Sequence, residues 1–98
     1  MSENKDLVRL HIWVIGRVQA VGFRAYVESH ARRLNLTGWV RNVGYDTVEA
    51  LAEGPRAAIE EFIAVVKQGP LGAHVDESRL DWETPTGEFH AFGVRRSQ

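Results

Sequence analysis

Gly16-Arg17-Val18-Gln19-Ala20-Val21-Gly22-Phe23-Arg24 is the stretch that decides the fold of this 98-residue chain. Before it, apolar residues alternate with other residues over positions 8–14, which predicts a half-buried strand. After it, apolar residues recur every three to four positions from Phe23 to Leu34, which predicts an amphipathic helix. A glycine-containing turn between a strand and a helix exposes backbone N–H groups to an anion, with the helix dipole behind them. Arg24 at the helix start adds a planar fork of donors that matches phosphate or carboxylate. The sequence therefore predicts an anion-binding turn.

The middle of the chain continues with strands, a turn and a second helix. Residues 39–42 predict a short strand, residues 43–46 a turn and residues 47–52 a third strand. Gly54-Pro55 predicts the start of the second helix, because proline suits the first helical position. Gly69-Pro70 predicts its end.

Two further strands are predicted, over residues 75–82 and 89–94. In the first of them Val75 does not share the parity of Leu80 and Trp82, which indicates a β-bulge or an exposed edge. The order strand, helix, strand, strand, helix, strand, with one extra strand, is typical of an α+β ferredoxin-like domain. We expect a split β-α-β sandwich in which two helices cover one face of an antiparallel sheet.

Length and composition exclude several classes of protein. The length suits one domain, which we expect over residues 1–98. A net charge of −1, from 12 basic and 13 acidic residues, gives no general attraction to nucleic acid or an anionic membrane. The absence of cysteine excludes disulfides and cysteine-ligated zinc and fits a reducing cytoplasm. Residues 1–6 lack the apolar stretch of a signal peptide, and no run reaches the ~18 apolar residues of a membrane span.

Two segments together resemble the signatures of the acylphosphatase family. Residues 16–24 are similar to the pattern Gly-x-Val-Gln-Gly-Val-x-Phe-Arg, and Gly38-Trp39-Val40-Arg41-Asn42 is similar to a Gly-aromatic-Val-x-Asn strand. Weaker likeness at residues 48–54 and 67–70 extends the resemblance over about residues 7–96, the expected core of the domain. The resemblance implies an enzyme that hydrolyses acyl phosphates to a carboxylate and inorganic phosphate without a metal or other cofactor.

The resemblance also implies roles for individual residues. Arg24 is expected to bind the phosphate, and Asn42 to orient the attacking water. The loop 18–24 is expected to bind the phosphate together with Arg24, with backbone donors from Gln19, Ala20, Val21, Gly22 and Phe23. Ala20 stands where the family usually has glycine. If this position needs a positive φ, alanine is strained by about 1 kcal/mol or more; otherwise the change is neutral or slightly stabilising.

The chemistry of an acyl phosphate fits this set of residues. Its leaving group is a carboxylate whose conjugate acid has a pKa of about 4, so no general acid is required. Phosphoryl transfer depends mainly on charge and position, so an arginine, a set of N–H donors and one residue that holds water suffice. Asn42 cannot act as a general base, because its amide takes up no proton at neutral pH. The expected partners are the acyl phosphate and inorganic phosphate, the latter as product and competitive inhibitor.

Two other functions are open on the sequence alone. The same strand and helix order serves RNA-binding domains, but these need an aromatic sheet signature and usually a basic face. We therefore expect no nucleic-acid partner and no membrane partner. The second alternative is a non-catalytic anion-binding or regulatory ferredoxin-like domain, and the presence of both Arg24 and Asn42 favours an enzyme over it. We expect a monomer in the cytoplasm.

The remaining polar residues point to no further site. The four histidines, His11, His30, His74 and His90, lack metal-ligand spacing, so no metal site is predicted. Arg17 and Arg41 are expected at the surface, where either adds positive potential.

Overall fold

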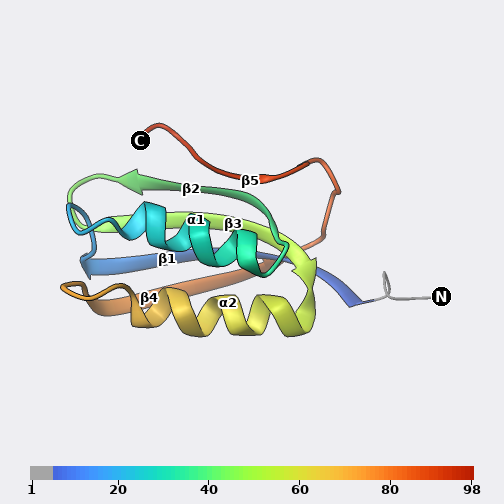
Figure 1. Ribbon diagram of the computed structural model, residues 1–98, viewed down its shortest axis with the longest axis horizontal. Helices are drawn as coiled ribbons and strands as arrows, with labels where there is room; N and C mark the ends of the chain where they lie inside the picture. The colour runs from blue at the N-terminus through green and yellow to red at the C-terminus, as the bar shows by residue number, and fades with distance from the viewer. Residues whose placement is uncertain (1–5) are drawn as a thin grey trace.

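The computed structural model describes residues 6–98 and contains a sheet of five strands with two helices (Figure 1). The elements follow one another as β1 (Leu7–Arg17), α1 (Phe23–Arg33), β2 (Thr37–Val43), β3 (Thr47–Pro55), α2 (Arg56–Gln68), β4 (His74–Glu83) and β5 (Phe92–Val94). The strand order across the sheet is β4-β1-β3-β2-β5. This arrangement confirms the predicted α+β ferredoxin-like fold.

The sequence predicts a wholly antiparallel sheet, but the observed sheet is mixed. Neighbouring strands run antiparallel except β2 and β5, which pair in parallel. The parallel pair arises because residues 84–91 carry the chain from the end of β4 to the opposite edge of the sheet (Figure 1). β5 covers three residues rather than the predicted 89–94, since only Phe92, Gly93 and Val94 pair with β2.

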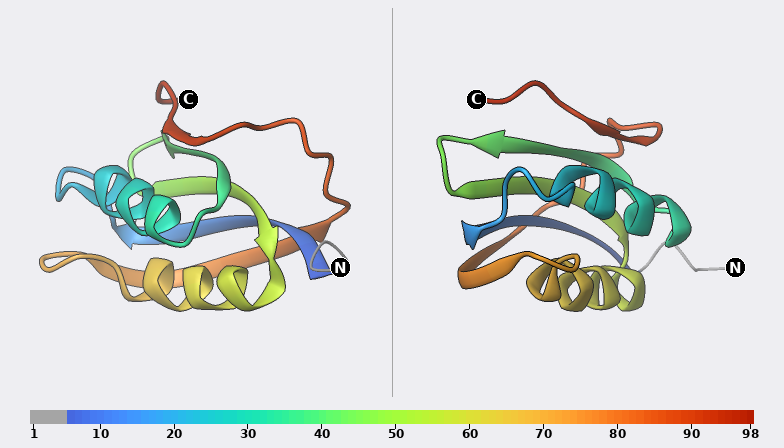
Figure 2. Two further views of the ribbon diagram at one scale, coloured as in Figure 1. Left: turned by 45° about the vertical axis from the view of Figure 1, so that its right-hand side comes forward. Right: turned by 60° about the vertical axis from the view of Figure 1, so that its left-hand side comes forward.

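Both helices lie on one face of the sheet, and the core fills the space between the two layers (Figure 2). β1 contributes one parity of its residues to this core, as its alternating pattern predicts: Leu10, Ile12 and Val14. Each helix contributes one stripe, at the predicted spacing: Phe23, Val27 and Ala31 from α1, and Ile59, Phe62 and Val66 from α2. Burial of these apolar side chains is the main stabilising contribution to the fold.

The parity change in β4 is a β-bulge, one of the two predicted alternatives. Ile15 pairs with Glu77 but Gly16 pairs with Val75, so the register shifts around Asp76. The shift brings Val75 to the core side together with Leu80. Gly16 is required here, because a Cβ at this position would lie 2.3 Å from the backbone oxygen of His74. The bulge therefore fits the end of β1 closely against β4, directly before the turn that leads to α1.

The face of the sheet away from the helices buries two carboxylates. Glu49 and Glu53 are only 5% and 7% exposed. Glu49 is bonded to His11 and Arg41, whose nitrogens lie 2.6 and 2.7 Å from its oxygens. Partners from distant segments, which no local periodicity encodes, cover these side chains.

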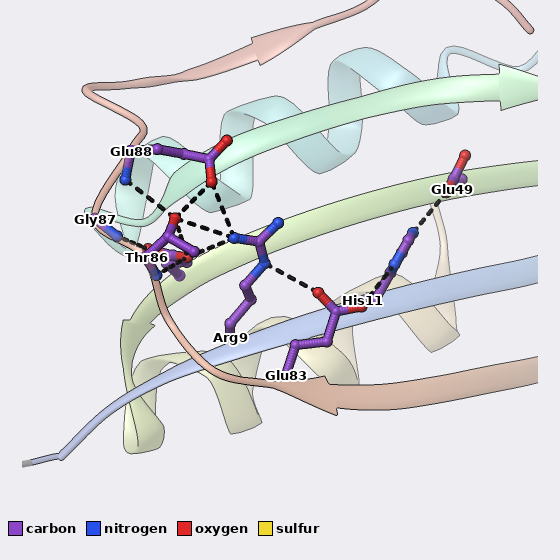
Figure 3. Close-up of polar contacts among 8 residues, drawn as sticks. Arg9, His11, Glu49, Glu83, Thr86, Gly87 and Glu88 are labelled. Carbon is purple, nitrogen blue, oxygen red and sulfur yellow. Dashed lines mark hydrogen bonds and ion pairs between the residues drawn. The ribbon is translucent and has the colours of Figure 1, made fainter.

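Glu53 belongs to a group of residues that we call the crossover network: Arg9, Glu53, Thr86, Gly87 and Glu88. Figure 3 labels Arg9, Thr86, Gly87 and Glu88. Glu53 accepts backbone N–H bonds from Thr86 and Gly87 at 2.8 and 3.0 Å and pairs with Arg9 at 3.1 Å. Burial opposes its ionisation, but these donors outweigh burial and hold the pKa of Glu53 below its usual value. The network ties the segment that leads to β5 onto the sheet.

Candidate active site

The turn predicted to bind an anion is the β1–α1 loop, residues 18–22. It lies at the same end of the sheet as the turn between β2 and β3 (Figure 1). Two of its residues adopt left-handed backbone conformations, Ala20 with φ 65° and Gly22 with φ 73°. Position 20 therefore does need a positive φ, and alanine is strained there by about 1 kcal/mol relative to glycine.

The first turn of α1 leaves backbone donors free. Its first hydrogen bond runs from the N–H of Tyr26 to the carbonyl of Gly22, at 3.0 Å. The preceding N–H groups, those of Phe23, Arg24 and Ala25, have no carbonyl within the helix to bond. No side chain caps this end, and the first turn carries no acid. The helix start thus offers N–H groups and the positive end of a dipole to an anion.

A cavity of about 310 Å³ adjoins this helix start. It is lined by Val18, Gln19, Ala20, Gly22, Phe23, Arg24, Ala25, Asn42 and Val94. Both predicted functional side chains, Arg24 and Asn42, therefore meet in one hollow. Of the predicted loop residues, Val21 does not line the cavity, because its side chain packs against the core.

Two lining residues, Ala25 and Val94, were not among the predicted site residues, whereas Val18 belongs to the predicted phosphate-binding loop 18–24. Ala25 directly follows the first motif, so its position was a usable signal for it. Val94 comes from β5, and only the long-range pairing of β5 with β2 brings it to the cavity.

Among residues 6–98, Arg24 is the one charged side chain that lines the cavity. It is half-buried, and within residues 6–98 it forms no ion pair. Arg41, by contrast, is bonded to Glu49 on the other face of the sheet, and Arg17 borders a separate hollow with His74 and Asp76. Neither arginine faces the cavity, so its positive charge comes from Arg24 and the helix start.

Asn42 places an unused acceptor beside this positive charge. It lies near the end of β2, where it pairs with Val48 of β3. Its Oδ1 is buried and has no hydrogen-bond partner among the described residues. A buried polar atom without a hydrogen-bond partner destabilises the fold by about 1–3 kcal/mol. A water or ligand in the cavity that donates a hydrogen bond to Oδ1 removes this penalty. The site combines a cationic anion pocket with an acceptor suited to holding water.

No group of three or more His, Cys, Asp or Glu in the described part of the chain is placed to hold a metal ion. Neither helix between residues 6 and 98 has the length and apolar character needed to cross a membrane.

Comparisons with known proteins agree with this geometry. The sequence model of the acylphosphatase family matches residues 10–94. A curated relative from Chloroflexus aurantiacus, named acylphosphatase, is 44% identical over 91% of this chain and 97% of its own length. The structure of an acylphosphatase from Coxiella burnetii has a TM-score of 0.89 and 33% identity, over 97% of this chain and 99% of that one. The chain belongs to the acylphosphatase family, and its class is that of a hydrolase.

The fold also matches a small part of a larger protein. The structure of full-length HypF in its phosphate- and nucleotide-bound form is 29% identical, with a TM-score of 0.83. The match covers 93% of this chain and 12% of that one.

Proposed function

We propose that this protein hydrolyses acyl phosphates to a carboxylate and inorganic phosphate in the cavity beside the start of α1. The observation that carries the proposal is that Arg24 and Asn42 line one cavity, while within the described residues Arg24 forms no ion pair and Asn42 Oδ1 has no hydrogen-bond partner. An unpaired cation and an unpaired acceptor are what a phosphate and a water require.

Arg24 and the free N–H groups at the start of α1 bind the phosphoryl oxygens. The guanidinium offers two parallel donors to two oxygens, and the backbone donors bind the rest. These groups are already in place before the substrate binds, so little reorganisation accompanies the growth of charge in the transition state.

Asn42 Oδ1 accepts a hydrogen bond from a water and holds its oxygen toward the phosphorus. The bond from water oxygen to phosphorus forms while the bond from phosphorus to the acyl oxygen breaks, and its electron pair leaves with the carboxylate. The amide of Asn42 takes no proton, so the proton of the water passes to a phosphate oxygen. The products are a carboxylate and inorganic phosphate.

The same site accounts for the expected partners. Inorganic phosphate fits the donors that hold the phosphoryl group, so it competes with the substrate. The carboxylate leaves without help, so the reaction requires no metal. We further propose that the protein works as a single-domain monomer in the cytoplasm, and size-exclusion chromatography of the purified protein tests the oligomeric state.

The decisive experiment is hydrolysis of benzoyl phosphate and acetyl phosphate by the purified protein, followed by release of phosphate. We expect turnover that survives EDTA and is inhibited competitively by inorganic phosphate. Loss of activity in EDTA that added metal restores contradicts a metal-free reaction. Phosphate binding without turnover of either substrate instead supports a non-catalytic anion-binding domain.

A further inference from the structure

The side chain of Gln19 reaches from the β1–α1 loop to the turn between β2 and β3. Its Nε2 donates to the backbone oxygens of Thr47, Gly44 and Val43, at 2.9, 3.1 and 3.4 Å. An amide nitrogen carries two hydrogens. These two hydrogens bond the two closer oxygens, and one of them is shared with the third oxygen. The three acceptors are backbone oxygens at the end of β2, in the turn and at the start of β3, so the side chain of Gln19 bridges two segments that carry different parts of the site.

On the loop side, Gln19 stands between Val18 and Ala20, and the loop continues into Gly22 and Arg24. Together these residues provide most of the wall of the cavity. Gln19 itself lines the cavity and is half-buried. Any movement of Gln19 therefore moves the segment that leads to the phosphate donors.

On the turn side, the first acceptor residue, Val43, directly follows Asn42. Val43 and Thr47 face each other across the turn, so the amide of Gln19 is bonded to both of its strands. A backbone bond from Gly16 N–H, near the end of β1, to Asp46 O in the same turn, at 2.8 Å, also ties the start of the loop to this turn. These contacts set where Asn42 lies relative to the loop.

The loop needs such a restraint because its conformation is strained. Ala20, the next residue, is held at φ 65° at a cost of about 1 kcal/mol. Bonds from the neighbouring side chain oppose relaxation of that strain. The motif predicts only a backbone donor at Gln19, but the structure gives its side chain a separate task.

We propose that Gln19 is a positioning residue that fixes the separation between the phosphate held by Arg24 and the water held by Asn42. The inference rests on the proposed hydrolysis. The amide touches neither the phosphorus nor the water in this account and acts through Asn42. A displacement of about 1 Å between reacting groups is enough to cost on the order of 100-fold in rate.

The test is the variant Gln19→Met, which keeps the length of the side chain and removes its donors. We expect kcat for benzoyl phosphate to fall about 10–100-fold. KM and the Kd for inorganic phosphate, measured by calorimetry, should stay within about threefold, because the donors to phosphate are retained. Gln68→Met, at the exposed end of α2, is the matched control and should behave as the wild type. Gln19→Ser, which cannot reach the turn, serves as a second variant if Gln19→Met does not fold.

A double-mutant cycle with Asn42→Ala separates positioning from a general structural role. If Gln19 acts through Asn42, Gln19→Met should change the residual kcat of Asn42→Ala by less than about twofold. Full additivity of the two changes, an unchanged kcat in Gln19→Met, or an equal loss of phosphate affinity and kcat each overturns the inference. An inactive wild-type protein overturns the proposed hydrolysis and this inference together, whereas an active wild type with an additive cycle overturns this inference alone.

Discussion

The crossover network and the active-site cavity are both built around an arginine, and they treat it in opposite ways. Arg9 has carboxylate oxygens of Glu53, Glu83 and Glu88 at 3.1, 3.1 and 3.3 Å. Arg24 lines a cavity with no acid and forms no ion pair within residues 6–98. An arginine that the protein neutralises itself holds segments together, whereas one left without a partner is available to a ligand.

Acceptors in the two regions differ in the same way. Glu53 accepts two backbone N–H bonds and an arginine, so its burial is compensated. Asn42 Oδ1 is buried without any such partner among the described residues. Changes in the network should therefore affect stability, and changes in the cavity should affect turnover.

The largest effect is expected for Arg24→Ala, which should lower kcat/KM for benzoyl phosphate by more than ~100-fold, the scale of removing one preorganised donor. Arg24→Lys should also lose most activity, because a point charge does not reproduce the bidentate fork. The melting temperature should change little. Arg33→Ala is the matched control on the same helix, since Arg33 is 49% exposed and its partners Glu61 and His30 do not line the cavity. Wild-type turnover in folded Arg24→Ala removes Arg24 from the mechanism.

Asn42→Ala should lower kcat by about 100-fold while phosphate affinity, measured by titration calorimetry, stays near that of the wild type. Because the position of the water matters mainly in the transition state, the substitution should lower kcat and leave the affinity for phosphate unchanged. Asn42→Asp should also be slow, because a carboxylate repels the phosphate. A faster Asn42→Asp variant points to general-base catalysis, and loss of phosphate binding in Asn42→Ala makes Asn42 an anion ligand.

In the crossover network, Glu53→Gln should lower the free energy of unfolding by about 1–3 kcal/mol at neutral pH and leave kcat near the wild-type value. The pKa of Glu53 is lowered by folding, so its contribution is present above the unfolded value of about 4.3 and is lost as the pH falls through the folded value. The stability difference between wild type and variant, measured by urea denaturation, should therefore shrink as the pH falls below about 4.3. A difference that stays constant down to strongly acidic pH contradicts this account.

The smallest effect is expected for Ala20→Gly, which should raise the free energy of unfolding by about 0.5–1 kcal/mol. Glycine adopts φ 65° without strain. It also gives the unfolded chain more conformational entropy, which offsets part of the gain in the free energy of unfolding. Asn35→Gly is a useful comparison, since Asn35 also has a positive φ, 59°, but asparagine tolerates this region better. Urea denaturation of both variants should give the larger gain at position 20. A destabilised Ala20→Gly would mean that the methyl group contributes packing that outweighs the strain.

Local patterns in the sequence were sufficient for most of the fold. The alternation in β1, the stripes of the two helices and the parity change at Val75 each depend on neighbours within a few positions. Arg24 and Asn42 were found because they end two short motifs, and both line the cavity. Their catalytic roles remain predictions.

What the sequence did not predict depends on contacts between distant segments. Burial of Glu49 and Glu53 requires partners from β1, β2 and residues 84–91. The place of Val94 in the cavity wall requires the parallel pairing of β5 with β2. The bonds from the Gln19 side chain depend on how the loop meets a turn more than twenty positions away. None of these contacts leaves a periodic signal.

The bulge in β4 also affects how this sheet meets other molecules. β4 is an edge strand, and a regular exposed edge would present backbone groups to a second copy of the chain. The register shift near Asp76 interrupts that row, and the exposed side chains of Glu77, Arg79 and Asp81 add charges along it. The opposite edge, β5, is only three residues long. The β-bulge that fits the end of β1 against β4 thus also disfavours edge-to-edge aggregation.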